Sequence, residues 1–189
     1  MGIWHFYYTK SIISPTIEKF KLKKRISVGS YGIVYLALFE DDSKYYALKK
    51  FLKSELQAKD AINERNILVK IKRIKNPFLL DIKFAFTDNK SFYIVTEFIQ
   101  GGYLGFHIDQ SEKGFSIEQA KFYAIEILLA IRCLHDNNIL YGDLKPANIL
   151  LDRNGHIKIC DFNSSIILKK KEELINTRGG TFGYSAPEV

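Results

Sequence analysis

The chain of 189 residues is 47% hydrophobic and 26% charged, a composition that excludes a disulfide mini-protein and a disordered tail. Lys and Arg outnumber Asp and Glu by 28 to 21, and the net charge of +7 fits a phosphate, nucleic-acid or acidic-membrane partner as well as a solvated basic face. Cys133 and Cys160 lie in apolar runs typical of reduced core thiols, and no apolar stretch approaches the ~20 residues that span a bilayer. We therefore expect a cytoplasmic protein without a transmembrane segment.

The first half of the chain reads as strands with one helix. Residues 1–17 form an aromatic-rich extension whose order depends on docking. Alternating and β-branched runs predict strands, and spaced apolar residues among good helix formers predict a helix closed by Asn76-Pro77. The expected strands are 20–26, 33–38, 45–49, 79–86 and 92–98, the last two joined at 88–90, and the expected helix is 54–74.

The second half of the chain switches to helical periodicity. Ser116 and Gln119 have the spacing of a capping box, which predicts a helix start. The residues that follow place an apolar stripe on one side of this helix, interpreted as core: Phe122, Ile125, Leu128, Leu129 and Cys133. Short strands are expected at 149–151 and 157–160, with 152–155 as the turn between them.

Two features of the first half suit a phosphate ligand. Gly29 and Gly32 lie in a strand turn, where missing side chains let backbone N–H groups approach phosphate oxygens, although most such pairs are only turns. Lys49 ends a strand and Glu64 lies in the following helix. A lysine that holds phosphate needs an anion to orient it, and two ordinary surface charges are the alternative.

A third feature carries the chemistry. Asp143, Lys145 and Asn148 share one loop, and Asp161 follows a strand shortly after. A carboxylate can accept the proton of an attacking hydroxyl, and a lysine can neutralise a transferring phosphoryl group. Asn and a second Asp are oxygen ligands suited to Mg²⁺. Chance assembly of all four in this order is improbable.

From Phe20 to its last residue the chain resembles a eukaryotic protein kinase. Residues 180–188 resemble the end of a kinase activation segment. Lys145, two residues after Asp143, occupies a position where serine/threonine kinases resemble this chain and tyrosine kinases do not. The amino-acid sequences at 63–65, 76–78, 97–102 and 122–127 resemble those of the AGC group of kinases. Within that group, residues 143–152 resemble G-protein-coupled receptor kinases. The resemblance implies an α+β, two-lobed fold, with an N-lobe at 18–99 and a partial C-lobe at 100–189.

The resemblance also implies roles in binding ATP and Mg²⁺. Lys49 would hold the α and β phosphates and pair with Glu64, and Asp143 would be the base. Lys145 would meet the γ-phosphoryl group, and Asn148 with Asp161 would hold Mg²⁺. Leu68, Ile82, Tyr141 and Phe162 would stack as an apolar column linking the lobes. The remaining nucleotide-binding positions would be Val28, Gly29, Ser30, Gly32, Val34, Ala47, Thr96, Glu97 and Ile99.

Four departures from the family pattern stand out. Ser27 replaces the first glycine of the turn, which predicts weaker nucleotide binding. Gly142 stands where most members carry arginine, so a phosphate on Thr177 would lose its main cationic partner and Thr177→Ala should alter activity little. Asn163 replaces the glycine after Asp161-Phe162, and Asn tolerates left-handed geometry. The chain stops at Val189, before the helices that would cover its apolar face, so we expect a fragment, poor solubility or a covering partner.

Three functions of different classes can be compared with these residues. The leading one is an ATP- and Mg²⁺-dependent serine/threonine protein kinase with a protein substrate. The runner-up is a pseudokinase that binds nucleotide or acts as a scaffold, and it is motivated by the four departures. A nucleic-acid binder is not expected, since no base-reading motif is visible. Tyr103 and Ala147 stand where basic-directed members place acids, which favours an acidic or phosphorylated target.

Overall fold

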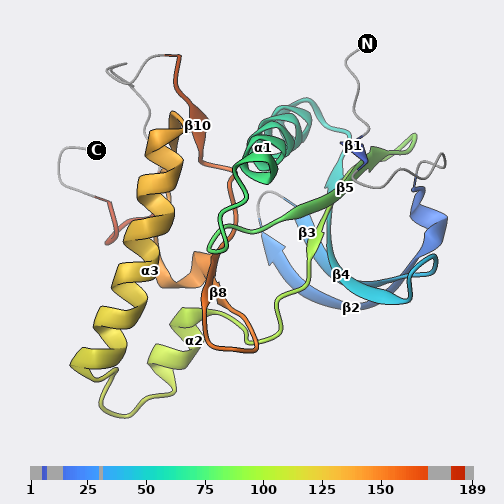
Figure 1. Ribbon diagram of the computed structural model, residues 1–189. Helices are drawn as coiled ribbons and strands as arrows, with labels where there is room; N and C mark the ends of the chain where they lie inside the picture. Colours follow the sequence, from blue (N-terminus) through green and yellow to red (C-terminus); the bar gives the residue numbers. More distant parts are fainter. Residues whose placement is uncertain (1–5, 8–14, 30–31, 170–179, 186–189) are drawn as a thin grey trace. The chain divides into compact units, whose positions relative to one another are not determined.

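The computed structural model describes residues 6–7, 15–29, 32–169 and 180–185 (Figure 1). Backbone contacts divide the chain into two compact units. The first unit comprises Met1–Lys72 and Asp81–Phe98, and the second comprises Arg73–Leu80 and Ile99–Val189. The predicted α+β class is confirmed, because a sheet dominates the first unit whereas helices and short strands make up the second.

The first unit is built on an antiparallel sheet, six-stranded over the described residues, in the order β1-β5-β6-β4-β3-β2. Every predicted strand of this half is present, and the N-terminal extension adds β1, which pairs with β5. The strands are β1 (Phe6–Tyr7), β2 (Phe20–Gly29), β3 (Gly32–Phe39), β4 (Lys44–Leu52), β5 (Ile82–Thr87) and β6 (Ser91–Glu97), and the 3-10 turn η1 (Ile17–Lys19) precedes β2.

Strand β5 begins three residues later than expected. Leu79 forms a parallel bridge with Ile159, and the Leu80 N–H donates to the Ile159 carbonyl at 3.0 Å, so both residues belong to the second unit. The turn after β5 lies where it was predicted. Oδ1 of Asp88 accepts hydrogen bonds from the backbone N–H groups of Lys90 and Ser91, each at 2.7 Å, and this closes the hairpin.

Helix α1 (Glu55–Ile74) agrees with the predicted helix. Its buried residues recur at helical spacing and include Ala61, Glu64, Leu68 and Ile71. Lys75 follows the helix with a φ of +58°, a left-handed backbone that ends it before Pro77. One face of α1 is therefore fixed by packing, and that face carries the carboxylate of Glu64.

Aromatic side chains form one core of the first unit. Phe20 stacks on Phe39 with ring centroids 4.7 Å apart, and Phe86 stacks on Tyr93 at 5.0 Å. Phe84 contacts Phe39 at 5.0 Å. These rings come from four strands of the sheet, and each buries a large apolar area, so they hold these strands together.

The second unit contains two helices among its described residues. Helix α3 begins with the predicted capping box: the Gln119 N–H donates to Ser116 Oγ at 3.2 Å, and the Ser116 N–H donates to Gln119 Oε1 at 2.9 Å. None of the described helices combines the length and hydropathy that crossing a membrane requires. The elements are α2 (Leu104–Asp109), α3 (Ile117–Asp136), β7 (Ile139–Leu140), η2 (Pro146–Asn148), β8 (Ile149–Leu151), β9 (Ile157–Ile159) and β10 (Ile166–Ile167).

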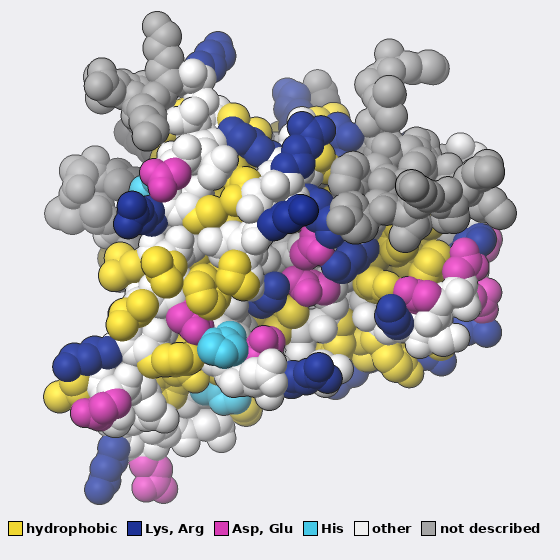
Figure 2. Space-filling model, viewed as in Figure 1, with side chains coloured by type: hydrophobic (Ala, Val, Ile, Leu, Met, Phe, Trp, Pro, Cys, Tyr) yellow, Lys and Arg dark blue, Asp and Glu magenta, His cyan; other side chains and the backbone are white. Residues whose placement is uncertain are grey.

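The prediction that the apolar stripe of α3 is core is wrong for the described chain. Figure 2 shows hydrophobic side chains gathered on the surface over this helix. The buried face is instead the one that carries Glu126, Ala130 and Leu134. Nothing among the described residues covers the stripe. Its exposed members are Phe122 at 43%, Ile125 at 58%, Leu128 at 67% and Leu129 at 48%, while Cys133 is half-buried.

Candidate active site

Lys49 and Glu64 form a buried ion pair inside the first unit. Nζ of Lys49, on β4, lies 2.9 Å from Oε2 and 3.1 Å from Oε1 of Glu64 on α1. The glutamate side chain is 5% exposed and the lysine side chain 15%. Charges this buried are stable only with a partner, so the interpretation as two ordinary surface charges is wrong. Each side chain fixes the orientation of the other.

The β2–β3 hairpin carries the predicted glycine turn. Gly29 pairs with Gly32 at the end of the ladder, and Ser30 and Tyr31 lie outside the described residues. Gly32 has a φ of +130°, and a Cβ there would meet the carbonyl oxygen of Lys50 at 2.5 Å. Only glycine allows this backbone conformation and this close approach of the neighbouring strand.

Four predicted nucleotide-binding positions share one face of the sheet. Val34 lies opposite Lys49 on the adjacent strand, and Ala47, two residues before Lys49, lies opposite Thr96. Because side chains alternate along a strand, these four point to the same side. Val28 is next to the residue that pairs with Val34, so its side chain points to the other face, where it is 62% exposed.

The two residues predicted to bind adenine, Glu97 and Ile99, belong to different units. Glu97 ends β6 in the first unit, where its N–H donates to the Asp81 carbonyl and its Oε1 accepts from the Asp81 N–H, both at 3.1 Å. Ile99 begins a segment of the second unit. The reciprocal bonds fix the backbone at Glu97. Adenine binding at these two residues stays a prediction.

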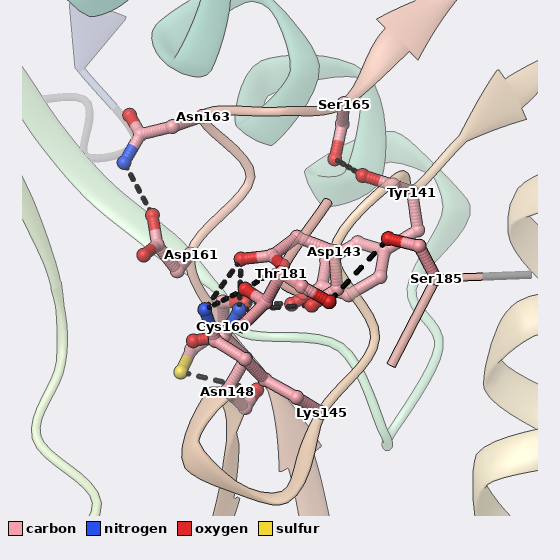
Figure 3. Close-up of polar contacts among 10 residues, drawn as sticks. All are labelled: Tyr141, Asp143, Lys145, Asn148, Cys160, Asp161, Asn163, Ser165, Thr181 and Ser185. Carbon is pink, nitrogen blue, oxygen red and sulfur yellow. Dashed lines mark hydrogen bonds and ion pairs between the residues drawn. The ribbon is translucent and has the colours of Figure 1, made fainter. Parts of the chain in front are cut away.

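Asp143 is the centre of a polar network within the second unit (Figure 3). Its Oδ2 lies 2.8 Å from Nζ of Lys145 and accepts a hydrogen bond from Nδ2 of Asn148 at 2.9 Å. Its Oδ1 accepts a hydrogen bond from the Thr181 hydroxyl at 2.6 Å, and Lys145 donates to the same hydroxyl oxygen at 2.6 Å. The structure thus brings together three residues that the sequence placed on one loop, and adds a fourth.

The network sets the charge of Asp143. Burial by itself raises the pKa of this carboxyl group, but hydrogen bonds from Lys145, Thr181 and Asn148 outweigh burial and leave the pKa below its usual value. Asp143 is therefore a carboxylate at neutral pH. A carboxylate offers about four acceptor sites, and the three side-chain bonds leave room for one further donor.

A short hairpin brings Asn148 and Asp161 to one end of the second unit. Ile149 of β8 pairs with Ile159 of β9, and the Cys160 N–H donates to the Asn148 carbonyl at 3.0 Å. Asp161 follows Cys160 directly. The backbone pairing of one hairpin therefore sets the spacing of the two predicted metal ligands.

The hairpin is held against α3 by Glu126. Oε2 of this buried carboxylate accepts a hydrogen bond from the Ile157 N–H at 2.9 Å, and Oε1 lies 2.6 Å from Nδ1 of His156. The hydrogen bond and the charge of Glu126 raise the pKa of His156. Sequence analysis missed both residues, because a lone glutamate within an apolar helix gives no signal of a partner thirty residues away.

The segment after β9 is packed against the loop 141–148, which carries Asp143. Phe162 is fully buried, and its ring meets that of Tyr141 edge to face with centroids 5.4 Å apart. Asp161 has a left-handed φ of +56°, and Nδ2 of Asn163 donates to its Oδ1. Leu68 and Ile82 are buried in the first unit, and their stacking with this ring pair across the lobes stays a prediction.

Gly142, which replaces the arginine of most family members, also has a backbone conformation that favours glycine. Its φ is +84°, and a Cβ there would meet the Ser164 carbonyl oxygen at 2.7 Å. The next residue, Ser165, donates from its hydroxyl to the Tyr141 carbonyl at 2.7 Å. These contacts therefore tie the loop 141–148 to the segment after Phe162. Thr177, the expected phosphorylation site, lies outside the described residues.

A cavity of about 230 Å³ lies in the second unit beside Asp143. Its walls come from α3, residues 140–144 and the segment 180–185. The residues that line it are Ile131, His135, Leu140, Tyr141, Gly142, Asp143, Leu144, Gly180, Thr181, Tyr184 and Ser185.

Comparison with known proteins decides the family. The family described as protein kinase domain matches residues 20–189. The chain belongs to this family. The two-lobed protein-kinase fold expected from the sequence is thereby confirmed. Lys49 lies in the first unit and Asp143 with Asp161 in the second, so their convergence on one kinase cleft stays a prediction.

Three curated relatives of this kinase-family chain are serine/threonine kinases of AGC type. Serine/threonine-protein kinase SCH9 of Candida albicans is 40% identical over 176 residues, 91% of this chain and 22% of that protein. Serine/threonine protein kinase ypkA of Aspergillus fumigatus is 40% identical over 93% of this chain and 28% of its own length. Serine/threonine-protein kinase gad8 of Schizosaccharomyces pombe is 40% identical over 92% of this chain and 31% of its own length.

The AGC prediction is therefore confirmed, whereas the likeness of 143–152 to G-protein-coupled receptor kinases stays a prediction. The chain spans less than a third of the length of these three relatives. Protein kinases use ATP, typically with Mg²⁺.

The oxygen donors of Asn148 and Asp161 fit Mg²⁺. Nδ2 of Asn148 donates both to the backbone carbonyl and to Oδ2 of Asp143, at 2.9 Å each, so its amide oxygen faces away from that carboxylate. With Asp161 it would form a small, hard donor set, of the kind that leaves Mg²⁺ most of its water and phosphate ligands. In the described part of the chain, no group of three or more His, Cys, Asp or Glu side chains gathers as an alternative metal site.

Proposed function

We propose that this chain carries the catalytic residues of a serine/threonine protein kinase that transfers the γ-phosphoryl group of ATP to a protein hydroxyl. The observation that supports this most is the network in which Lys145, Asn148 and Thr181 all bond to the carboxylate of Asp143. A lysine beside an ionised aspartate suits a reaction in which a proton and a phosphoryl group move at the same place.

In this proposal Asp143 and Lys145 have different roles in the transfer of the phosphoryl group. The hydroxyl oxygen of the protein substrate attacks the γ-phosphorus, and the bond from that phosphorus to the β–γ bridging oxygen breaks. The remaining acceptor site of Asp143 orients the hydroxyl and receives its proton, while the ammonium of Lys145 neutralises charge on the transferring group. ADP leaves with the electron pair of the broken bond.

The ion pair of Lys49 and Glu64 holds the α and β phosphates in this proposal. Glu64 holds the Lys49 side chain in one orientation, so this side chain loses little conformational freedom when phosphate binds. Asn148 and Asp161 hold magnesium, which when bound supplies positive charge to the phosphate oxygens. The glycine turn, from Val28 to Val34, covers the nucleotide.

The proposal extends to substrate, partner and location. An acidic or phosphorylated protein target is expected, because Tyr103 and Ala147 supply no carboxylates for an arginine-rich one. The exposed apolar stripe of α3 supports a covering partner or further chain segment. Two cysteines without a disulfide support a cytoplasmic location.

Phosphate transfer tests the proposal. The full chain is incubated with Mg²⁺, ATP labelled at the γ position, and acidic and basic protein substrates. Asp143→Asn keeps the size of the side chain but removes the base, and should lower the rate at least about a hundredfold. Asp109→Asn, at the exposed end of α2, is the matched control and should keep the wild-type rate. Equal rates for the wild type and Asp143→Asn would refute the enzymatic proposal.

A nucleotide-binding pseudokinase is the second candidate, favoured by Gly142 and Asn163 in place of the family's arginine and glycine. It predicts saturable ATP binding without transfer to any substrate. ATP binding measured by calorimetry on the same samples separates the two functions, because Asp143→Asn removes the base and leaves the nucleotide contacts intact.

A further inference from the structure

Asn163 clamps the backbone turn that carries Asp161. Its Nδ2 atom donates to Oδ1 of Asp161, and the two side chains face each other across the turn (Figure 3). Phe162, between them, is fully buried and packed against Tyr141. The turn is thus anchored by a buried ring on one side and closed by a hydrogen bond on the other.

The turn needs such a clamp because of its backbone. Asp161 has a φ of +56°, a left-handed conformation that is unfavourable for a residue with a Cβ. Glycine at position 163 would add backbone freedom and offer no donor. Asparagine does the opposite in both respects, since its side chain restricts the backbone and its amide bonds to the carboxylate.

We propose that Asn163 is a positioning residue that presets the carboxylate of Asp161 for a divalent cation. The inference rests on the proposed role of Asp161 as a magnesium ligand. A carboxylate has about four acceptor sites, so the bond from Asn163 leaves capacity for a metal. Donors that bond to a metal ligand fix its direction, and their loss typically costs 10–100-fold in metal affinity.

The two cysteines of the chain provide a readout that needs no metal. Cys160 is 9% exposed, lies directly before Asp161, and its thiol bonds to the Asn148 carbonyl at 3.3 Å. Alkylation of Cys160 therefore requires the turn to open. Cys133 is half-buried on α3 and serves as the internal control.

The variants are Asn163→Ala, which removes the amide, and Asn163→Gly, which also frees the backbone. Alkylation by iodoacetamide, followed by mass spectrometry of each cysteine peptide, should show Cys160 reacting roughly tenfold faster in Asn163→Ala and faster still in Asn163→Gly. The rate at Cys133 should not change. A Cys160 rate within twofold of wild type, or equal acceleration at both cysteines, would overturn the clamp.

Metal dependence is the second readout. ATP binding is measured by calorimetry over a series of Mg²⁺ concentrations, and Asn163→Ala should raise the half-saturating Mg²⁺ concentration about tenfold or more. An unchanged Mg²⁺ dependence would overturn the positioning role. If the wild-type chain binds no ATP at any Mg²⁺ concentration, the proposed function fails, whereas the alkylation ratio still decides whether Asn163 holds the turn.

Discussion

Removing the carboxylate of Glu126 should destabilise the second unit by a predictable amount. Its Oε2 accepts the N–H of Ile157, a residue with no exposed surface, at 2.9 Å. A hydrogen bond to a charged group contributes about 1.5–3 kcal/mol, and truncation also leaves the buried N–H without this acceptor. We therefore expect Glu126→Ala to lower the free energy of unfolding by about 2–3 kcal/mol.

Thermal unfolding followed by circular dichroism at a helix band measures this effect. For a chain of this size about 2–3 kcal/mol corresponds to a fall in Tm of roughly 5–10 °C. Glu126→Gln keeps a neutral acceptor for the Ile157 N–H and should lose less than half as much. Glu118→Gln, an exposed carboxylate on the same helix, is the control and should stay close to wild type. If Glu126→Ala has the same Tm as the Glu118→Gln control, Glu126 does not hold the hairpin.

Three further predictions follow from the same geometry. Because Glu126 raises the pKa of His156 above its usual value of 6.5, protonated His156 stabilises the fold below that pH, and this contribution disappears as pH rises through the raised pKa. The Tm difference between wild type and His156→Gln should thus shrink from about pH 6 to about pH 9, and a constant difference would contradict it. Gly142→Arg should cost about 1–3 kcal/mol in urea unfolding, because its Cβ would lie 2.7 Å from the Ser164 oxygen in a left-handed backbone, and wild-type stability would show that the contact relaxes freely. Lys49→Met should lower the free energy of unfolding by about 3 kcal/mol, because it leaves Glu64 buried without the lysine ammonium. Adding Glu64→Leu to this variant should restore part of the lost stability in the same assay. If the double variant is no more stable than Lys49→Met, the buried ion pair is refuted.

The elements of the fold were predictable from local signals. The capping box at Ser116 and Gln119 and the turn at Asp88 depend on residues two or three positions apart, and both formed as expected. The sequence could not show what covers an apolar helix face. The stripe that includes Ile125 and Leu128 has core periodicity, yet it lies on the surface of the described chain.

The candidate site was predictable in its chemistry and not in its contacts. Asp143, Lys145 and Asn148 lie within one loop, so their proximity follows from chain connectivity alone. The bond from Thr181 joins residues 38 positions apart, and no pattern announces such a contact before the chain folds. The cost of a Cβ at Gly142 likewise depends on a carbonyl from a later segment.

The β8–β9 hairpin joins both predicted metal ligands through one short piece of hydrogen-bonded backbone. The separation between Asn148 and Asp161 is consequently independent of any arrangement that the two units adopt. In the proposed kinase, cation binding depends on hydrogen bonds around this hairpin, whereas phosphate binding also depends on the lysine of the other unit.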